Sequence, residues 1–216
     1  MSTLVAATVE ATTLEETTSG DTVTVQALLN PWEVVGLHTV NGDATLDFFH
    51  DGWEGVGSAA FIDGWEYRVT TDNVYGNSST VSRWNLYLYE AGVIRNSASD
   101  YRTVYFGTSG GIGAVAMGTA YTFDALGAYH VSTAGNTSDY ACNGAAIFKN
   151  LGSTSFPAEW DGVHAARKNS GVANLQRING SQSFAGGTAA VSKVQFVANA
   201  TTQDGGRMIL ERRYVG

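Results

Sequence analysis

The chain has 216 residues, of which 44% are hydrophobic and 15% charged, and it contains 26 glycines but 2 prolines. A chain this apolar can bury enough surface to offset the entropy cost of ordering it, which excludes intrinsic disorder. It has no Gly-X-Y period and no dominance of Ala, Glu, Lys and Leu, which excludes collagen and coiled coils. The formal net charge of −8 argues against nucleic acid as the main partner.

The charge is divided unevenly along the chain. Residues 1–100 contain three Arg and fourteen Asp or Glu, whereas residues 101–216 contain nine bases and six acids. The two halves could therefore attract each other, within a subunit or between subunits, around Arg207, Arg212 and Arg213. Ordinary scatter of surface charge is the alternative interpretation.

The first thirty residues differ in composition from the rest. They are rich in Thr, lack Lys, Arg and aromatic residues, and carry four acids. This composition is wrong for a secretory or transit peptide. With Pro31 at the boundary, the sequence predicts an extended N-terminal arm over residues 1–30 and one β domain over residues 31–216.

Beyond the boundary, a strand-like period of two dominates. Apolar and polar residues alternate over residues 22–28, 44–48, 67–70, 84–89 and 194–197. Turn signals punctuate the chain at Asn41-Gly42, Asp51-Gly52, Asp63-Gly64, Gly76-Asn77, Asn143-Gly144, Asp161-Gly162, Asn179-Gly180 and Asp204-Gly205-Gly206. The pattern predicts an all-β fold, a jelly-roll-like antiparallel β-sandwich.

Two stretches could depart from this pattern. Residues 160–168 allow two helical turns at most. Residues 103–123 carry no charge, but five Gly and five Thr or Ser make them a weak membrane span, and we expect no membrane insertion. A pair of buried, glycine-interrupted strands is the preferred interpretation.

Candidate chemistry is sparse. The glycine run over residues 107–116 matches the loop of short-chain dehydrogenases, but a poor helix follows it and the Tyr-x-x-x-Lys pair is missing. The four His residues never fall three or four apart, and there is one Cys. Asp43, Asp47 and Asp51 would share one strand face, either as a solvated acidic face or as a cation site. We expect no catalytic residue, metal or cofactor, and no enzyme.

Tryptophans beside turns are the candidates for ligand contact. Trp53, Trp65, Trp84 and Trp160 lie next to turns or at strand ends, where an indole can stack on a sugar ring. Among glycan contacts the sequence favours Trp160 with the adjacent Asp161, but for these tryptophans as a group it favours packing in the core or an interface over ligand contact.

The order of several short segments resembles a known family. The opening Met1-Ser2-Thr3-Leu4 and the stretch Leu14 to Gly20 are similar to the N-terminal segments of fibre and appendage proteins of tailed bacteriophages. The resemblance to a tail-fibre β domain continues through Trp32, Asp43 to Phe48, Tyr67, Asp72-Asn73-Val74, Leu86-Tyr87-Leu88, Gly92 and Ser99-Asp100-Tyr101, and then Val194-Gln195-Phe196, Asp204-Gly205-Gly206 and Met208 to Leu210.

The resemblance implies a structural protein on the outer surface of a phage virion. Such a protein is usually a homotrimer whose N-terminal arm docks on other virion proteins, here through Leu4, Val5, Val9 and Leu14. It implies a tail fibre or appendage that contacts the host surface. A head decoration or head-fibre protein, and a carbohydrate-binding module that recognises a host glycan, are the alternatives.

Overall fold

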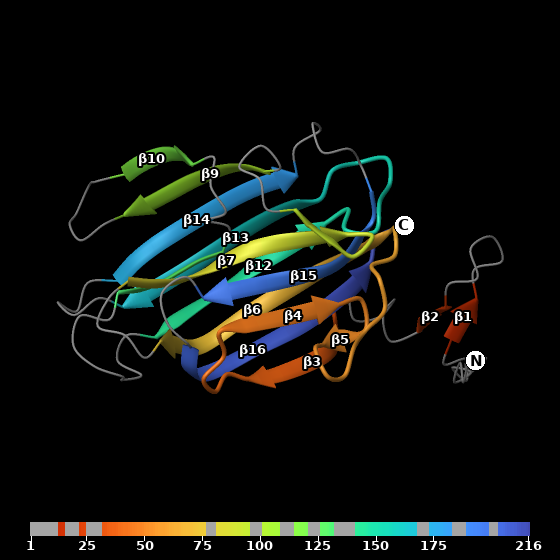
Figure 1. Cartoon of the computed structure of the whole chain (residues 1–216), viewed down its shortest axis with the longest axis horizontal. Coiled ribbons are helices and arrows are strands. Elements are labelled where there is room, and N and C mark those ends of the chain that lie inside the picture. Colours follow the sequence, from red (N-terminus) through yellow and green to blue (C-terminus); the bar gives the residue numbers. More distant parts are fainter. Residues whose placement is uncertain are drawn as a thin grey trace, which may run out of the picture.

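The computed structural model describes residues 13–15, 22–24, 32–76, 81–95, 101–108, 115–120, 126–131, 141–167, 173–182, 189–198 and 203–216. Every regular element in these ranges is a β-strand (Figure 1). They form two large antiparallel sheets and a separate two-stranded sheet. The all-β prediction is confirmed, and the two large sheets pack as a β-sandwich; the jelly-roll connectivity stays a prediction.

The larger sheet contains eight strands and the smaller sheet six, one of which lies off the main strand order. The eight-stranded sheet has the order β10 (Val115–Ala120), β9 (Tyr101–Thr108), β14 (Ala173–Gln182), β13 (Glu159–Arg167), β12 (Cys142–Lys149), β6 (Trp65–Gly76), β16 (Gln203–Tyr214) and β3 (Glu33–Thr39). The six-stranded sheet has the order β11 (Leu126–Val131), β7 (Val81–Glu90), β15 (Val191–Ala198), β4 (Thr45–Phe49) and β5 (Gly52–Trp53), with β8 (Val93–Arg95) paired to β7.

The core lies between the two large sheets. The six-stranded sheet contributes Leu46 and Phe48 of β4, Leu86 and Leu88 of β7, and Val194 and Phe196 of β15. The eight-stranded sheet contributes alternate residues, among them Tyr67, Val69, Ala146, Phe148, Trp160, Met208 and Leu210. Because strand side chains alternate between faces, the residues in between point away from the core and form the outward side of the sheet.

A cluster of rings forms the centre of this core. Phe48 packs edge-on against Phe61 and Phe148 at centroid distances of 5.5 and 5.4 Å, and it stacks on Phe196 at 5.5 Å. Phe48, Phe148 and Phe196 are fully buried. Rings from both sheets interlock here, which fixes the relative position of the sheets.

Several predicted turns lie inside strands instead. Asn143-Gly144, Asp161-Gly162 and Asn179-Gly180 fall within β12, β13 and β14. Gly162, for example, pairs with Ala146 on one side and Ile178 on the other. A glycine flanked by paired strands stays extended, and an Asn-Gly or Asp-Gly signal makes a turn only where the chain needs positive φ.

The structure also bears on the predictions for residues 160–168 and for the uncharged residues 103–123. Residues 160–167 belong to β13, so the short-helix interpretation is wrong: burial alternates from Trp160 to Val163 with a period of two. The described residues of the uncharged stretch lie in β9 and β10, which pair antiparallel as the strand interpretation predicted, with Gly107 opposite Ala116; the burial of these strands stays a prediction. The middle of the glycine run, residues 109–114, lies outside the described residues.

The predicted arm is described at two short strands. β1 (Thr13–Glu15) and β2 (Thr22–Thr24) pair antiparallel with each other, with Leu14 opposite Val23. Leu4, Val5 and Val9, the other predicted docking residues, lie outside the described ranges. The described residues include no helix with the length and hydropathy of a membrane span.

The unequal charge of the two halves is matched within the chain. β16 lies between β6 and β3, and its bases pair with acids of the N-terminal half: Arg207 with Asp72, Arg212 with Glu33, and Arg213 with Glu66. The attraction inferred from the sequence therefore acts inside one subunit, where it joins the last strand to its two neighbours.

Candidate functional site

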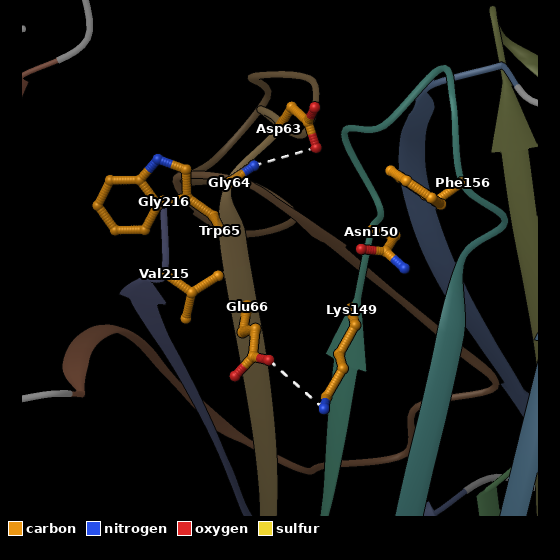
Figure 2. Close-up of a pocket in the computed structure, with 9 residues that line it drawn as sticks. All are labelled: Asp63, Gly64, Trp65, Glu66, Lys149, Asn150, Phe156, Val215 and Gly216. Carbon is orange, nitrogen blue, oxygen red and sulfur yellow. Dashed lines mark hydrogen bonds and ion pairs between the residues drawn. The ribbon is translucent and has the colours of Figure 1, made fainter.

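A pocket of about 220 Å³ lies at one end of the sandwich, where three chain segments meet (Figure 2). The turn before β6, the loop between β12 and β13, and the residues after β16 supply its walls. It is lined by Asp63, Gly64, Trp65, Glu66, Lys149, Asn150, Phe156, Val215 and Gly216. Because these segments are far apart in the sequence, the sheet register alone brings them together.

The Asp63-Gly64 turn forms one wall and is tied to the end of β16. Gly64 has φ +80°, and a Cβ at this position would lie 3.0 Å from the Gly216 carbonyl oxygen. The Val215 N–H donates to the Gly64 carbonyl oxygen at 2.8 Å. Both the backbone conformation and the close approach therefore require glycine here.

The loop between β12 and β13 forms the opposite wall. The Ser153 side chain is buried, and its Oγ accepts hydrogen bonds from the backbone N–H groups of Ser155 and Phe156, each at 3.2 Å. Gly152 packs so closely that a Cβ there would lie 2.1 Å from the Ile62 carbonyl carbon. These contacts hold the two walls in fixed positions, so the pocket is formed before any ligand arrives.

The pocket combines charged groups with an exposed aromatic ring. The Lys149 Nζ lies 3.6 Å from the Glu66 Oε1, and the two side chains face each other from neighbouring strands (Figure 2). Phe156 is 63% exposed, and Asp63 is exposed on the opposite wall. Carboxylates accept hydrogen bonds from hydroxyls, an ammonium donates, and a ring face packs on C–H groups; this set suits a small, hydroxyl-rich ligand.

The sequence-favoured glycan pair is not brought together on one face. Trp160 is 3% exposed and points into the core, where it lies opposite Phe148 on β12. Asp161 is the next residue on the same strand and points to the outward side, so the two cannot contact one ligand. Trp53 and Trp65 are also buried, which makes them packing residues; the side chain of Trp84 lies outside the described residues.

Sequence reasoning missed Phe156 and Lys149 because neither stands in a motif. The Asp63-Gly64 turn was the one available signal at the pocket, and it indicated a turn without indicating its neighbours. Phe156 lies in a loop with Pro157 and two serines, which is typical of an ordinary connection.

The three equally spaced aspartates do not form one site. Asp47 is buried and bonds to Lys193 at 2.5 Å and to Gln195 at 2.8 Å. Asp43 bonds to His38 at 2.9 Å. The third, Asp51, accepts hydrogen bonds from two backbone N–H groups. Each carboxylate therefore has different partners, and the prediction of a shared, solvated acidic face is wrong. Among the described residues, no group of three or more His, Cys, Asp and Glu is placed to hold a metal.

Two groups with shifted pKa values lie away from the pocket. Burial acts to raise the pKa of Asp51, but the N–H groups of Ala59 and Ser58 outweigh it and hold the pKa below its ordinary value of 3.8. Burial raises the pKa of the Tyr67 hydroxyl. Neither group lines the pocket. Asp51 holds the backbone of Ser58 and Ala59, and Tyr67 belongs to the core.

The point at which the N-terminal segment joins the sandwich is also built from charged groups. The Trp32 ring lies 4.4 Å from the Arg68 Cζ and 4.6 Å from the Arg213 Cζ. Arg68 makes two hydrogen bonds of 2.6 Å to Glu211, and Arg213 bonds to Glu66. Cation–π contacts to guanidinium groups that are themselves held by carboxylates anchor Trp32 on the outward side of the eight-stranded sheet.

No protein-family model matches the chain, and comparisons with curated proteins and with solved structures find no significant similarity.

Proposed function

We propose that this protein is a structural component of a tailed-bacteriophage virion, of the tail-fibre or appendage type. Its N-terminal segment attaches to other virion proteins, and its β-sandwich is displayed on the outer surface of the particle to contact the host. Its work is binding rather than catalysis. The sequence resemblance and the β-sandwich both support this proposal.

The observation that carries the proposal is the anchorage of Trp32. An attachment segment can transmit load to a displayed domain only if their junction is fixed, and Trp32 is held by Arg68 and Arg213, each of which is itself held by a carboxylate. The junction lies between the predicted arm and the first strand of the sandwich, which is where such a protein needs it.

The experiment is to locate the chain on particles. An antibody to the β-sandwich should label the tail appendages of purified phage in electron micrographs. Label on the head would support the decoration or head-fibre alternative instead, and particles without the chain would overturn the proposal.

A second function, recognition of a host glycan, is favoured by the preformed pocket. Its exposed Phe156 ring, Asp63 carboxylate and Lys149 ammonium are groups that bind sugars. Phe156→Ala should abolish binding on an array of bacterial glycans, whereas Val56→Ala, at an exposed loop position outside the pocket, should not. An array on which the wild-type protein binds nothing contradicts this second function and leaves the virion proposal standing.

A further inference from the structure

The outward side of the eight-stranded sheet carries its side chains in rows that the strand register fixes. Two rows cross β3, β16, β6, β12 and β13, a third crosses β16, β6, β12 and β13, and a fourth crosses β3, β16 and β6. They contain Leu37, Ile209, Thr70, Ala145 and Val163; Val34, Glu211, Arg68, Ile147 and Asp161; Arg213, Glu66, Lys149 and Glu159; and Thr39, Arg207 and Asp72. These rows are called the outer face below.

An apolar row crosses the outer face from one strand to the next. Leu37 is 59% exposed at one end and Val163 is 45% exposed at the other. Ile209, Thr70 and Ala145 lie between them and are partly exposed. With neighbouring strands about 4.8 Å apart, the row is about 19 Å long. Four of the five residues in this row are apolar, and exposed apolar patches on a protein surface mark interaction sites.

The charged rows beside this strip nearly cancel. Arg68 pairs with Glu211, Arg213 and Lys149 both pair with Glu66, and Arg207 pairs with Asp72. Counting the four rows in full, four bases face five acids, which leaves a formal charge of −1 on the outer face, whereas the whole chain carries −8. Two copies of an acidic chain repel each other least where the local charge is close to zero.

The N-terminal segment is a less suitable occupant of this surface. Residues 1–31 carry four acids and no base, so they find no net attraction on a face that is itself slightly negative. Their junction at Trp32 lies on the same side, beside the row that contains Arg213. Trp32 packs on Arg68 and Arg213 of the outer face, so copies that meet through this face would each bring Trp32 to the shared surface.

We infer that the outer face is the surface through which copies of this chain associate. The inference rests on the proposed function and on the homotrimer that the sequence resemblance implies, and it names the surface that the subunits share. The apolar strip supplies the buried contact, and the internally paired charges around it allow like copies to approach.

The test is the oligomeric state of the full chain in solution. Sedimentation velocity of the wild-type protein should show a concentration-dependent oligomer. Leu37→Glu and Val163→Glu should each raise the dissociation constant tenfold or more. Val93→Glu, at a site 63% exposed on the six-stranded sheet, adds the same charge and should leave association unchanged. Circular dichroism should show the same strand content in all variants, because these positions are exposed.

Three results would overturn the inference. The wild-type chain could remain a monomer at every concentration, or the face variants could associate as tightly as the wild type. Deletion of residues 1–30 could abolish association while the face variants retain it, which would assign assembly to the N-terminal segment. Each of these results is independent of particle labelling, so the inference and the proposed function can fail separately.

Discussion

The ring of Trp32 lies 4.4 Å from the guanidinium carbon of Arg68, on a strand that begins thirty-three residues later in the sequence. Arg68 is held in turn by Glu211 near the end of the chain. Residues from the start, middle and end of the sandwich therefore meet where the N-terminal segment joins it.

Removal of this ring should loosen the junction without unfolding the sandwich. In Trp32→Ala, we expect hydrogen exchange at the amides of Glu33, Val34 and Val35 to accelerate several-fold, because each cation–π contact contributes about 0.5–1 kcal/mol. Amides of β15, in the other sheet, should be unchanged. Trp32→Phe, which retains an aromatic face, should exchange at an intermediate rate; equal exchange in all three proteins would show that the ring does not anchor the junction.

Removal of the buried hydrogen bond between His50 and Tyr67 should destabilise the fold. Arg212 donates to the His50 Nε2 at 2.9 Å, so the ring proton sits on Nδ1, which bonds to the Tyr67 hydroxyl at 2.6 Å. Tyr67→Phe removes this buried hydrogen bond, and should lower the free energy of unfolding in urea by about 1–3 kcal/mol.

Tyr89→Phe is the matched control for that substitution. The Tyr89 hydroxyl donates to Gln195 at 3.1 Å from a partly exposed position, where water can replace it. Its loss should cost less than about 1 kcal/mol. A Tyr89 effect as large as that of Tyr67 would show that burial does not set the cost.

Asp51 predicts a pH-dependent contribution to stability. Its pKa in the folded state lies below the ordinary value of 3.8, so the contribution is complete above that value and is lost as the pH falls through the folded pKa. Asp51→Asn should lower the free energy of unfolding by about 1 kcal/mol at neutral pH, because the carboxylate is exposed to solvent screening. The difference from wild type should shrink as the pH falls below 3.8 and through the lowered pKa of the folded state. A difference that stays constant with pH would exclude the charge as its source.

Gly152 predicts that the pocket depends on close loop packing. A Cβ there would lie 2.1 Å from Ile62 backbone, so Gly152→Ala must displace one wall and should lower the free energy of unfolding by about 2 kcal/mol or more. Gly42 has φ +73° and no atom within 4 Å of an added Cβ, so Gly42→Ala should lower the free energy of unfolding only by the backbone strain, about 1 kcal/mol. Thermal unfolding of both variants compares these costs, and equal shifts would contradict the packing argument.

The sequence predicted the fold class well because strand periodicity is a local signal. The alternation over residues 84–89 and 194–197 falls in β7 and β15, which pair with each other. The turn signals failed at Gly144, Gly162 and Gly180, because local chemistry does not reveal that paired strands flank these glycines on both sides.

The candidate site was harder to predict because it depends on register. Trp160 carried the chemistry of a sugar platform, but a strand alternates its faces and this residue falls on the buried one. Phe156 and Lys149 line the same pocket as Asp63 because β6 pairs with β12, and no short motif encodes that pairing. The resemblance to phage fibres suggested a role but no binding residue at the pocket.

The most direct test of the central claim, that the chain is a virion component, is immunogold electron microscopy of purified phage particles, with an antibody raised against residues 32–216. We expect gold at the tail appendages, and peptides of this chain in the mass spectrum of the same particles. Particles that carry neither the label nor the peptides would contradict it.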